Sequence, residues 1–311
     1  MEEEKVIKSY KGFDKNMQCQ GFQYEVGKEY EMDGDIKCCN RGFHACESPL
    51  EVFDHYDMLN SRFAEVEQSG KIDKEDKSTK VCSSHIKVKA ELKLADIINI
   101  GVEWLKDTTS PSKINKSTDL NDNGGDAAKI GSSGDYAQIG SSGYYTQIGS
   151  GGDYAQIGSS GDFVQIGSGG DYAQISSSGY YAKIGSSGYY AQIGSSGYSA
   201  QIGSSGDAAK IGSSGDAAKI GSCGYSAQIS SNGYYAQINS TGEDSVIMCA
   251  GNGSIAKAKV GSWITLAEWV WDGKKERSVP KCVKTEYVDG ERIKADTWYQ
   301  LKNGVFTEVT N

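Results

Sequence analysis

Isoleucine recurs at every ninth position through the middle of the chain. From Asp122 to Ile247 the sequence divides into fourteen nonapeptides, with Gly at position 4 and Ile at position 9 of every copy. Position 7 is Ala in eleven copies and position 8 is Gln in nine, as in GSSGDYAQI at Gly131–Ile139. A disordered Gly/Ser-rich linker does not keep Ile in register over so many copies, so the pattern indicates a stacked repeat fold.

Each nonapeptide joins a glycine-rich half to an alternating half. Gly-Ser-Ser-Gly is unfavourable in a helix and suits a tight turn with positive φ. Tyr-Ala-Gln-Ile alternates like a short strand, which predicts that Ala and Ile face inward and that Tyr and Gln face outward. Strands stacked about 4.8 Å apart would pair along the array and align the Ile side chains into one interior. We therefore predict a parallel β-solenoid over residues 122–247.

The number of nonapeptides in one coil is not fixed by the repeat itself. Ile with Ala makes a thin interior, which favours two facing sheets with eighteen residues, or two nonapeptides, per coil. A three-sided coil of twenty-seven residues is the alternative. Position 5 shows no alternation between odd and even copies, so both arrangements stay open.

The segment before the repeats has a mixed pattern. Residues 1–110 combine alternating stretches such as His85–Leu94 with a predicted helix at Ser48–Tyr56. Within this helix, Ser48 and Glu51 have the spacing of a capping box. The segment therefore predicts a compact α+β domain.

The segment after the repeats has the pattern of antiparallel strands. Residues 111–121 read as a connection, and residues 248–311 contain strand-like stretches separated by turn dipeptides. An uncapped solenoid end is a sheet edge that invites aggregation, so we expect both flanks to cap the array. The predicted fold class is mainly β, a nonapeptide-repeat parallel β-solenoid capped by an N-terminal α+β domain and a C-terminal antiparallel β domain. The dipeptides that favour hairpins are Asp272-Gly273, Asp289-Gly290 and Asn303-Gly304.

Composition and charge exclude several classes of protein. The formal net charge is −9, which argues against a general binder of nucleic acids or membrane surfaces. Residues 122–247 carry ten acidic residues and four Lys, so the repeats would repel phosphate groups. The acidic start, MEEEKVIKSYKGF, does not have the pattern of a signal peptide, and no apolar run reaches the roughly 20 residues of a membrane helix. We expect a cytoplasmic protein whose eight Cys are reduced.

The nonapeptide resembles the calcium-binding repeat of secreted toxins, G-G-x-G-x-D-x-U-x. That resemblance implies a similar architecture. It does not imply calcium binding, because position 6, where that family carries its Asp ligand, is Asp only at Asp244. The other thirteen copies have Tyr, Phe, Ala or Ser there, and calcium requires several oxygen ligands. We expect no metal and no cofactor.

A second resemblance covers roughly the first 110 residues and the C-terminal stretch VDGERIKADTWYQLKNGVF. The motifs YKGF (Tyr10–Phe13), GFQYEVGKEYE (Gly21–Glu31) and RGFHACESPLEVFDHY (Arg41–Tyr56) are similar to a domain of uncharacterised phage and prophage proteins. The resemblance implies a phage-encoded protein that acts on host machinery, such as a defence system, in the cytoplasm of a bacterial host. It implies no site residues.

Two clusters in the first domain could carry chemistry. The Cys38-Cys39, His44 and Cys46 spacing fits no standard zinc module, so we interpret these side chains as buried thiols beside a histidine. Tyr10–Gly12, Gly42–His44 and Arg62–Glu65 resemble, in order, elements of ADP-ribosyltransferase-like folds. This resemblance implies an alternative function, an N-terminal enzyme with the solenoid as a spacer. Glu65 and Glu67 would be its candidate carboxylates.

The repeat surface is the main candidate site. No Walker loop, nucleophile elbow or zincin motif is present, and an aromatic row beside an amide row is typical of a binding surface. We predict a non-enzymatic protein that presents this surface to a macromolecular partner, a host protein rather than a nucleic acid or membrane. Two alternatives are that the rows only stabilise the coils and that the chain is a homo-oligomeric structural phage component. The predicted contact residues are Tyr136, Tyr145, Tyr154, Phe163, Tyr172, Tyr181 and Tyr190 with Gln138, Gln147 and Gln156.

Overall fold

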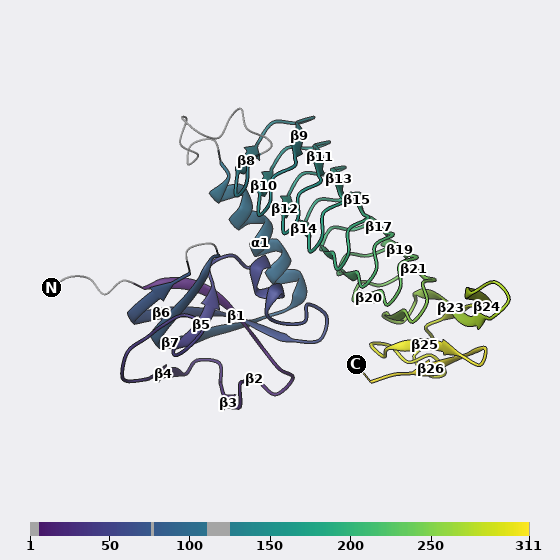
Figure 1. Cartoon of the computed structure of the whole chain (residues 1–311), viewed down its shortest axis with the longest axis horizontal. Helices are drawn as coiled ribbons and strands as arrows, with labels where there is room; N and C mark the ends of the chain where they lie inside the picture. The colour runs from purple at the N-terminus through teal and green to yellow at the C-terminus, as the bar shows by residue number, and fades with distance from the viewer. Residues whose placement is uncertain (1–5, 76–77, 111–124, 311) are drawn as a thin grey trace. The chain divides into compact units, whose positions relative to one another are not determined.

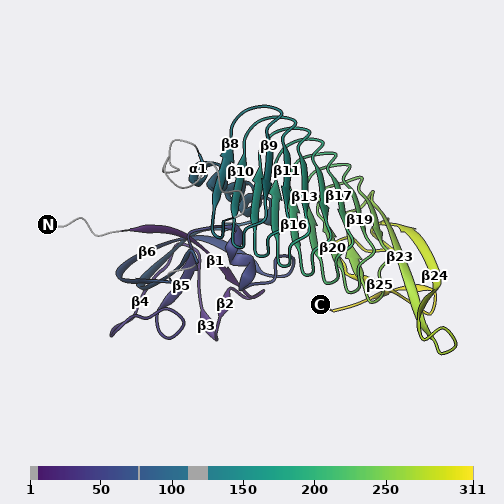
Figure 2. The same cartoon turned by 45° about the horizontal axis from the view of Figure 1, so that its top comes forward.

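The computed structural model describes residues 6–75, 78–110 and 125–310. It is mainly β, with one α-helix in the described part of the chain. The chain divides into two compact units, with the boundary between Trp104 and Leu105. The first unit is an antiparallel sheet domain and the second is the solenoid with its C-terminal strands (Figures 1 and 2). The predicted connection at residues 111–121 lies outside the described residues.

The N-terminal unit is built on one antiparallel sheet with strand order β4-β7-β5-β1-β6. An additional pairing between β6 and β7 joins the sheet back on itself. Phe13, Val66 and Ile86 lie in its apolar core. A separate two-stranded ribbon is formed by β2 and β3. The strands are β1 (Ile7–Phe13), β2 (Gln18–Cys19), β3 (Phe22–Gln23), β4 (Glu29–Glu31), β5 (Phe43–Cys46), β6 (Arg62–Lys74) and β7 (Lys80–Leu92).

The predicted helix at Ser48–Tyr56 is wrong in type and length. Only Leu50–Asp54 is helical, as the 3-10 helix η1, and the capping box does not form. The Glu51 carboxylate instead accepts hydrogen bonds from the backbone N–H and the hydroxyl of Thr79. A long-range partner has replaced the local one.

The one α-helix, α1 (Leu94–Thr108), was not predicted from the sequence. Ile97, Ile98, Val102 and Leu105 are fully buried along one side of it, which is the spacing of an amphipathic helix. Its first part packs on η1, where a Cβ on Gly101 would lie 2.7 Å from Leu50. The signal was present in the sequence, but the strand-like alternation of the preceding segment obscured it.

The repeats form the predicted parallel β-solenoid with two facing sheets. Even-numbered strands β8 to β22 make one sheet and odd-numbered strands β9 to β23 make the other, called here the even sheet and the odd sheet. Gln147 pairs with Gln165 in register, so one coil contains eighteen residues. This pairing confirms two nonapeptides per coil and excludes three. Figure 2 shows the coils stacked side by side with turns at both edges.

The solenoid strands are short and equal. Each contains four residues until the last coil, and all run parallel to their neighbours within a sheet. Their bounds are β8 (Lys129–Ser132), β9 (Gln138–Ser141), β10 (Gln147–Ser150), β11 (Gln156–Ser159), β12 (Gln165–Ser168), β13 (Gln174–Ser177), β14 (Lys183–Ser186), β15 (Gln192–Ser195), β16 (Gln201–Ser204), β17 (Lys210–Ser213), β18 (Lys219–Ser222), β19 (Gln228–Ser231), β20 (Gln237–Ser240), β21 (Val246–Cys249), β22 (Ile255–Lys257) and β23 (Trp263–Asp272).

The strand occupies a different part of the nonapeptide from the one predicted. It consists of positions 8 and 9 and of positions 1 and 2 of the next copy, Gln-Ile-Gly-Ser in β15, rather than Tyr-Ala-Gln-Ile. Ile193 and Ser195 are buried, whereas Gln192 is exposed. Position 7 is still buried, as Ala191 shows, so the prediction that Ala and Ile face inward is confirmed. Position 6 lies in the turn and not in the strand.

The predicted role of the position 4 glycine is also corrected. Positive φ occurs at position 6, as at Tyr190 with φ 55°, and not at the glycine. The glycine is required by close stacking, because a Cβ on Gly188 would lie 1.9 Å from the carbonyl oxygen of Gly170 in the preceding coil. A side chain at position 4 would therefore push the coils apart.

The parallel ladders continue beyond Ile247. Residues 248–256 form a fifteenth, irregular nonapeptide whose position 6 is Gly253, with φ 71°. The odd sheet ends at β24 (Arg277–Tyr287), antiparallel to β23, and the even sheet ends at β25 (Tyr299–Lys302) and β26 (Val305–Glu308). The C-terminal antiparallel cap is thus confirmed.

Two of the three predicted hairpin turns are confirmed. Asp272-Gly273 joins β23 to β24, and Asn303-Gly304 joins β25 to β26 with positive φ at both residues. Asp289-Gly290 forms a turn closed by the Gly290 N–H on the Ile293 carbonyl, but it does not link two paired strands. Within the described residues, no helix combines the length and apolar character needed to cross a membrane.

Candidate binding surfaces

Position 6 projects its side chain from the turn between the two sheets. Every position 6 residue from Ala127 to Asp244 has a positive φ, between 53° and 57°. This left-handed conformation costs most residues about 1 kcal/mol, and Gly or Asn is usual there. Eight of these positions nevertheless carry Tyr or Phe. The backbone therefore does not explain the choice of an aromatic residue.

The predicted single row of aromatic residues is in fact two ladders. Consecutive nonapeptides enter opposite sheets, so alternate turns lie at opposite edges of the coil. Neighbouring rings within each ladder are nearly parallel, with centroids 5.0 to 5.1 Å apart. The first ladder is Tyr136, Tyr154, Tyr172 and Tyr190, and the second ladder is Tyr145, Phe163 and Tyr181.

Carboxylates accompany the first ladder. Asp135, Asp153 and Asp171 occupy position 5 of its turns. Each Oδ1 accepts the backbone N–H of position 5 in the next coil, as Asp153 does from Asp171 at 2.8 Å. The pKa of the Tyr154 hydroxyl is raised by desolvation first and by its Tyr and Asp neighbours second. The first ladder is thus an aromatic strip with an acidic border.

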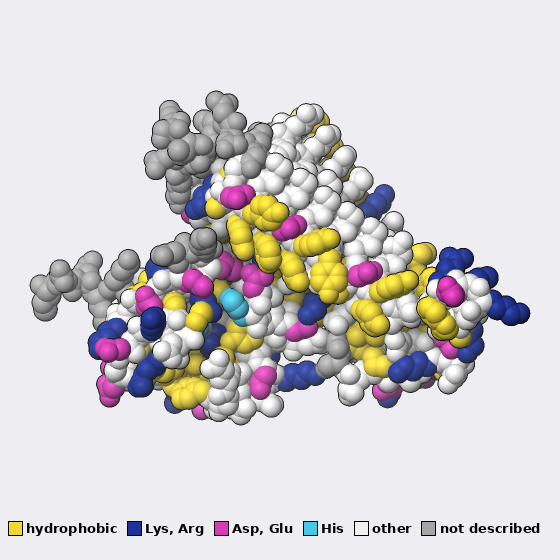
Figure 3. Space-filling view, in the orientation of Figure 1, with side chains coloured by type: hydrophobic (Ala, Val, Ile, Leu, Met, Phe, Trp, Pro, Cys, Tyr) yellow, Lys and Arg dark blue, Asp and Glu magenta, His cyan; other side chains and the backbone are white. Residues whose placement is uncertain are grey.

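Six further exposed tyrosines occupy position 5, and the sequence interpretation did not include them. Among ring contacts between these six, Tyr180 and Tyr198 make an edge contact, with centroids 6.3 Å apart. The sequence did contain a signal for these residues, because position 5 carries either Asp or Tyr in nearly every copy. Figure 3 shows hydrophobic side chains in rows along the solenoid, with acidic side chains beside them. The six residues are Tyr144, Tyr180, Tyr189, Tyr198, Tyr225 and Tyr234.

The predicted amide residues do not share one face with the aromatic residues. Gln138 and Gln156 lie on the outer face of the odd sheet, whereas Gln147 lies in the even sheet. All three are strand residues, and the aromatic residues are turn residues. The combined Tyr/Gln face is therefore wrong, and the structure places aromatic side chains at the edges and amides on the flat faces.

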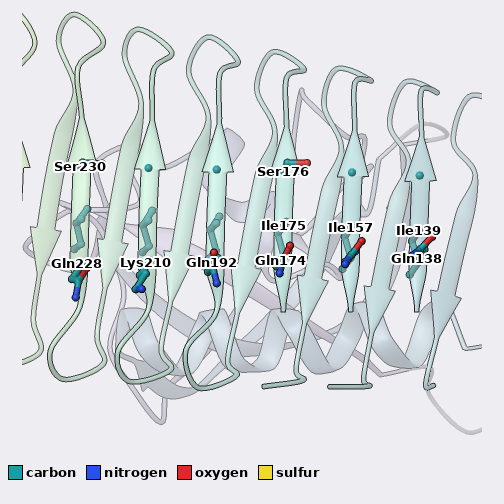
Figure 4. A pocket seen from close by; sticks show the side chains of 18 of the residues that line it. Gln138, Ile139, Ile157, Gln174, Ile175, Ser176, Gln192, Lys210, Gln228 and Ser230 are labelled. Carbon is teal, nitrogen blue, oxygen red and sulfur yellow. The ribbon is translucent and has the colours of Figure 1, made fainter. Parts of the chain in front are cut away.

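The outer face of the odd sheet contains a long open groove with a volume of about 1030 Å³. Position 8 side chains form a ridge along it, and the small position 1 residues form its floor. Figure 4 shows Gln138, Gln174, Gln192 and Gln228 in one row with Lys210. We call this feature the odd-face groove.

The corresponding face of the even sheet is partly covered by the chain itself. Residues 105–109 lie so close that a Cβ on Gly149 would be 2.3 Å from the Thr109 hydroxyl oxygen. A Cβ on Gly131 would be 1.8 Å from the Thr109 carbonyl oxygen. Position 1 glycines therefore admit another backbone to close contact, whereas Gly140 and Gly194 on the odd face have no atom within 4 Å of an added Cβ.

The N-terminal unit has a cleft of about 850 Å³ that contains a buried lysine. Lys11 in β1 is 2% exposed, and its ammonium donates to the His44 carbonyl at 2.9 Å. The Tyr56 hydroxyl lies 3.4 Å away and the Cys19 thiol 3.5 Å away. Burial lowers the pKa of Lys11. Within the described residues, no carboxylate forms an ion pair with Lys11.

The structure separates the candidate residues of the enzyme alternative. His44 lines the cleft, but Glu65 and Glu67 do not, and Glu65 pairs with Lys8 at 2.9 Å. The backbone N–H of Cys39 donates to His44 Nε2 at 3.1 Å, and burial lowers the pKa of His44. Over the described ranges, three or more metal-type ligands do not come together.

Residues 7–100 match the family model described as a domain of unknown function (DUF7666). The match begins at β1 and ends within α1, so it covers the cleft and stops before the solenoid. No curated protein and no solved structure matches the chain. The N-terminal unit is therefore similar to a family without an assigned activity.

Proposed function

We propose that the chain is a non-enzymatic binding protein whose solenoid presents aromatic side chains to a protein partner. The observation that carries this proposal is the pair of exposed aromatic ladders on backbone positions that do not require aromatic residues. In the first ladder, Tyr136 is 70% exposed and Tyr172 is 42% exposed even though both rings are stacked. Large aromatic side chains bring contact area at low entropy cost, which is why Tyr is common at binding hot spots.

The border of the first ladder indicates the chemistry of the partner. Asp135, Asp153 and Asp171 place carboxylates beside stacked Tyr rings, an arrangement that favours Arg or Lys side chains through both charge and cation–π attraction. A partner with a basic strip fits this edge better than a nucleic acid does, because phosphate groups would be repelled. The phage setting and a bacterial host protein as the partner rest on the sequence resemblance of the first 110 residues.

The proposal is tested by replacing Tyr136, Tyr154 and Tyr172 together with Ser. The coils already accept Ser at position 6, at Ser199 and Ser226, so the fold is expected to persist. The full-length wild-type chain is used to capture a protein from bacterial lysate, and the purified partner is then titrated against each variant. The triple variant is expected to lose about 2 kcal/mol of binding free energy, or roughly 30-fold in affinity.

A matched control changes the second ladder at Tyr145, Phe163 and Tyr181 to Ser. If the first ladder carries binding, this control keeps most of the affinity. The enzyme alternative makes the opposite prediction, since binding or activity would survive both triple variants and fail in Glu65→Gln or His44→Ala. That pattern of results would assign the function to the N-terminal unit.

The N-terminal cleft supports a second candidate function, the binding of a small organic anion. Burial without a carboxylate partner disfavours the charged form of Lys11, and an anion bound in the cleft would stabilise that form. Lys80 and His44 also line the cleft, and Phe22 and Phe43 supply aromatic walls. We propose that a carboxylate or phosphate group is held by Lys11, with the aromatic walls against the rest of the ligand.

Replacing Lys11 with Met separates a binding role from a structural one. If Lys11 is kept for a ligand, Lys11→Met removes a buried amine that has no carboxylate partner and raises the melting temperature, while the stabilisation by added phosphate or benzoate disappears. If Lys11 instead supports the fold through His44 and Tyr56, Lys11→Met lowers the melting temperature. Lys8→Met, which removes an exposed ion pair, is the control and is expected to change stability by about 0.5 kcal/mol.

A further inference from the structure

The outer face of the odd sheet ends in an exposed apolar patch. Val246 and Met248 in β21 are both 52% exposed, and Trp263 in β23 is 48% exposed. Tyr287 in β24 lies beside Trp263, with ring centroids 5.1 Å apart. These four side chains occupy the same columns as the ridge and floor of the odd-face groove, so patch and groove form one continuous surface.

This surface is almost uncharged on a strongly acidic chain. Of the residues that line the groove, Lys210 alone carries a charge. The position 5 carboxylates lie in the turns at the two edges of the coil. Two copies that met at an edge would bring like charges together. Two copies that met at the odd face would not, so the charge distribution favours this face for self-association.

We propose that the odd face binds a second copy of the chain. In this arrangement the two copies are related by a two-fold axis that lies in the interface and runs parallel to the solenoid axis. The coils of both copies then follow one another in the same direction, and the strands of one copy run opposite to those of the other. Position 8 of one copy then opposes position 1 of the other, so that Gln192 of one copy lies over Gly194 of the other. The ridge of each copy fills the groove of its mate, and Val246 meets Met248 at the apolar end.

The size of the face fits a stable dimer. Nine strands spaced about 4.8 Å apart, with four residues of about 3.3 Å counted from each, give a flat footprint of roughly 570 Å² per copy, and β23 and β24 are longer than these four residues. Because the face has a ridge and a groove, its accessible area is larger than this flat footprint. It approaches the approximately 800 Å² that each partner buries in an interface of standard size. The covered even face shows that position 1 glycines permit close approach of another chain segment.

The experiment measures the mass of the full-length chain by light scattering and sedimentation over a range of concentrations. The wild type is expected at twice 33.4 kDa and Gly194→Lys at 33.4 kDa, because the new side chain fills the groove. Gly194 has no positive φ and open space around it, and the natural Ser176 at the same position shows that the strand accepts a side chain. Gly273→Lys is the matched control, since Gly273 is equally open but lies in the β23–β24 turn, and it is expected to stay dimeric.

A second variant keeps the proposal testable if Gly194→Lys does not fold. Met248→Lys places a charge in the exposed apolar patch and is expected to give a monomer with the circular dichroism and melting temperature of a folded chain. A wild type that stays at 33.4 kDa at all concentrations overturns the proposal. A dimer that persists in both Gly194→Lys and Met248→Lys overturns it as well.

The orientation of the two copies is tested by photo-crosslinking from residue 138. With p-benzoylphenylalanine in place of Gln138, the proposed axis predicts crosslinks within the dimer band to residues 138–141 of the other copy. Crosslinks to residues 246–249 would show reversed coil order and overturn the proposed axis.

Discussion

The interior and the turns of the same nonapeptide follow opposite rules. Inside, Ile occupies position 9 of all fourteen copies and Gly occupies position 4, because each stacks directly on its equivalent in the next coil. In the turns, position 6 accepts Tyr, Phe, Ala, Ser and Asp with almost the same φ. The difference shows that the stack is specified by the invariant positions, which leaves the variable turn positions available for recognition.

The largest effect on stability is expected when a charge is introduced into the interior of the solenoid. Ile184 is 2% exposed and lies in the middle of the even sheet, so Ile184→Asp buries a carboxylate without a partner. We expect a loss of about 4 kcal/mol or more in the free energy of unfolding, measured by urea denaturation. Ile184→Val is the control and should cost about 1 kcal/mol. Unchanged melting of Ile184→Asp would contradict an interior built on the Ile ladder.

A smaller but sharper test compares two glycines six residues apart. Gly188→Ala places a methyl group 1.9 Å from the Gly170 carbonyl oxygen, so we expect a loss of about 2 kcal/mol or more from forced separation of the coils. Gly194→Ala meets no atom within 4 Å and should stabilise the chain by about 0.5 kcal/mol through the unfolded state. Equal effects at both sites would show that position 4 is not fixed by stacking.

The sequence predicted the architecture of the repeats but not the phase of the strand within them. An invariant Ile with an alternating neighbour is enough to identify a stacked β fold. The thin interior favoured two copies per coil over three, and the pairing of Gln147 with Gln165 decides between them. The phase was wrong because Gly at position 1 was assigned to a turn, although Gly194 is a strand residue facing open space. Left-handed backbone at Tyr190 is not visible in a sequence, since Tyr rarely adopts it.

The candidate surfaces could be predicted only in part, because the sequence does not show which repeat positions lie in turns and which lie in strands. Strand alternation predicted that the Tyr residues are exposed, and they are exposed, but from turns rather than from strands. Their division into two ladders depends on which turn each one occupies. The lysine cleft was missed because His44 and Tyr56 lie 33 and 45 residues from Lys11 in the sequence and meet it only in the folded N-terminal unit. The odd-face groove depends on which face the chain covers with its own segments.

Replacing the buried serine at position 2 of the nonapeptide is expected to change the free energy of unfolding very little. Ser186 is fully buried, and its hydroxyl has no hydrogen-bond partner among the described residues. Ser186→Ala removes an unsatisfied polar group, so we expect stability to stay the same or to rise slightly. Ser240→Ala is the contrast, since the Ser240 hydroxyl lies 2.8 Å from the Ser245 hydroxyl, and its loss should cost about 1 kcal/mol. Equal losses at both sites would show that the interior serines share a role that hydrogen bonds to protein do not explain.

Removal of calcium is expected to have no effect, although the nonapeptide resembles a calcium-binding repeat. Calcium needs six to eight oxygen ligands, and the described residues contain no cluster of three or more metal-type ligands. The position 5 carboxylates already have a structural role, since Asp162 accepts the backbone N–H of Tyr180 at 2.7 Å and Asp207 that of Tyr225 at 2.8 Å. Circular dichroism spectra and melting curves recorded with a chelator and with millimolar calcium should superimpose. A loss of strand signal in the chelator would show that these carboxylates hold a metal ion rather than the next coil.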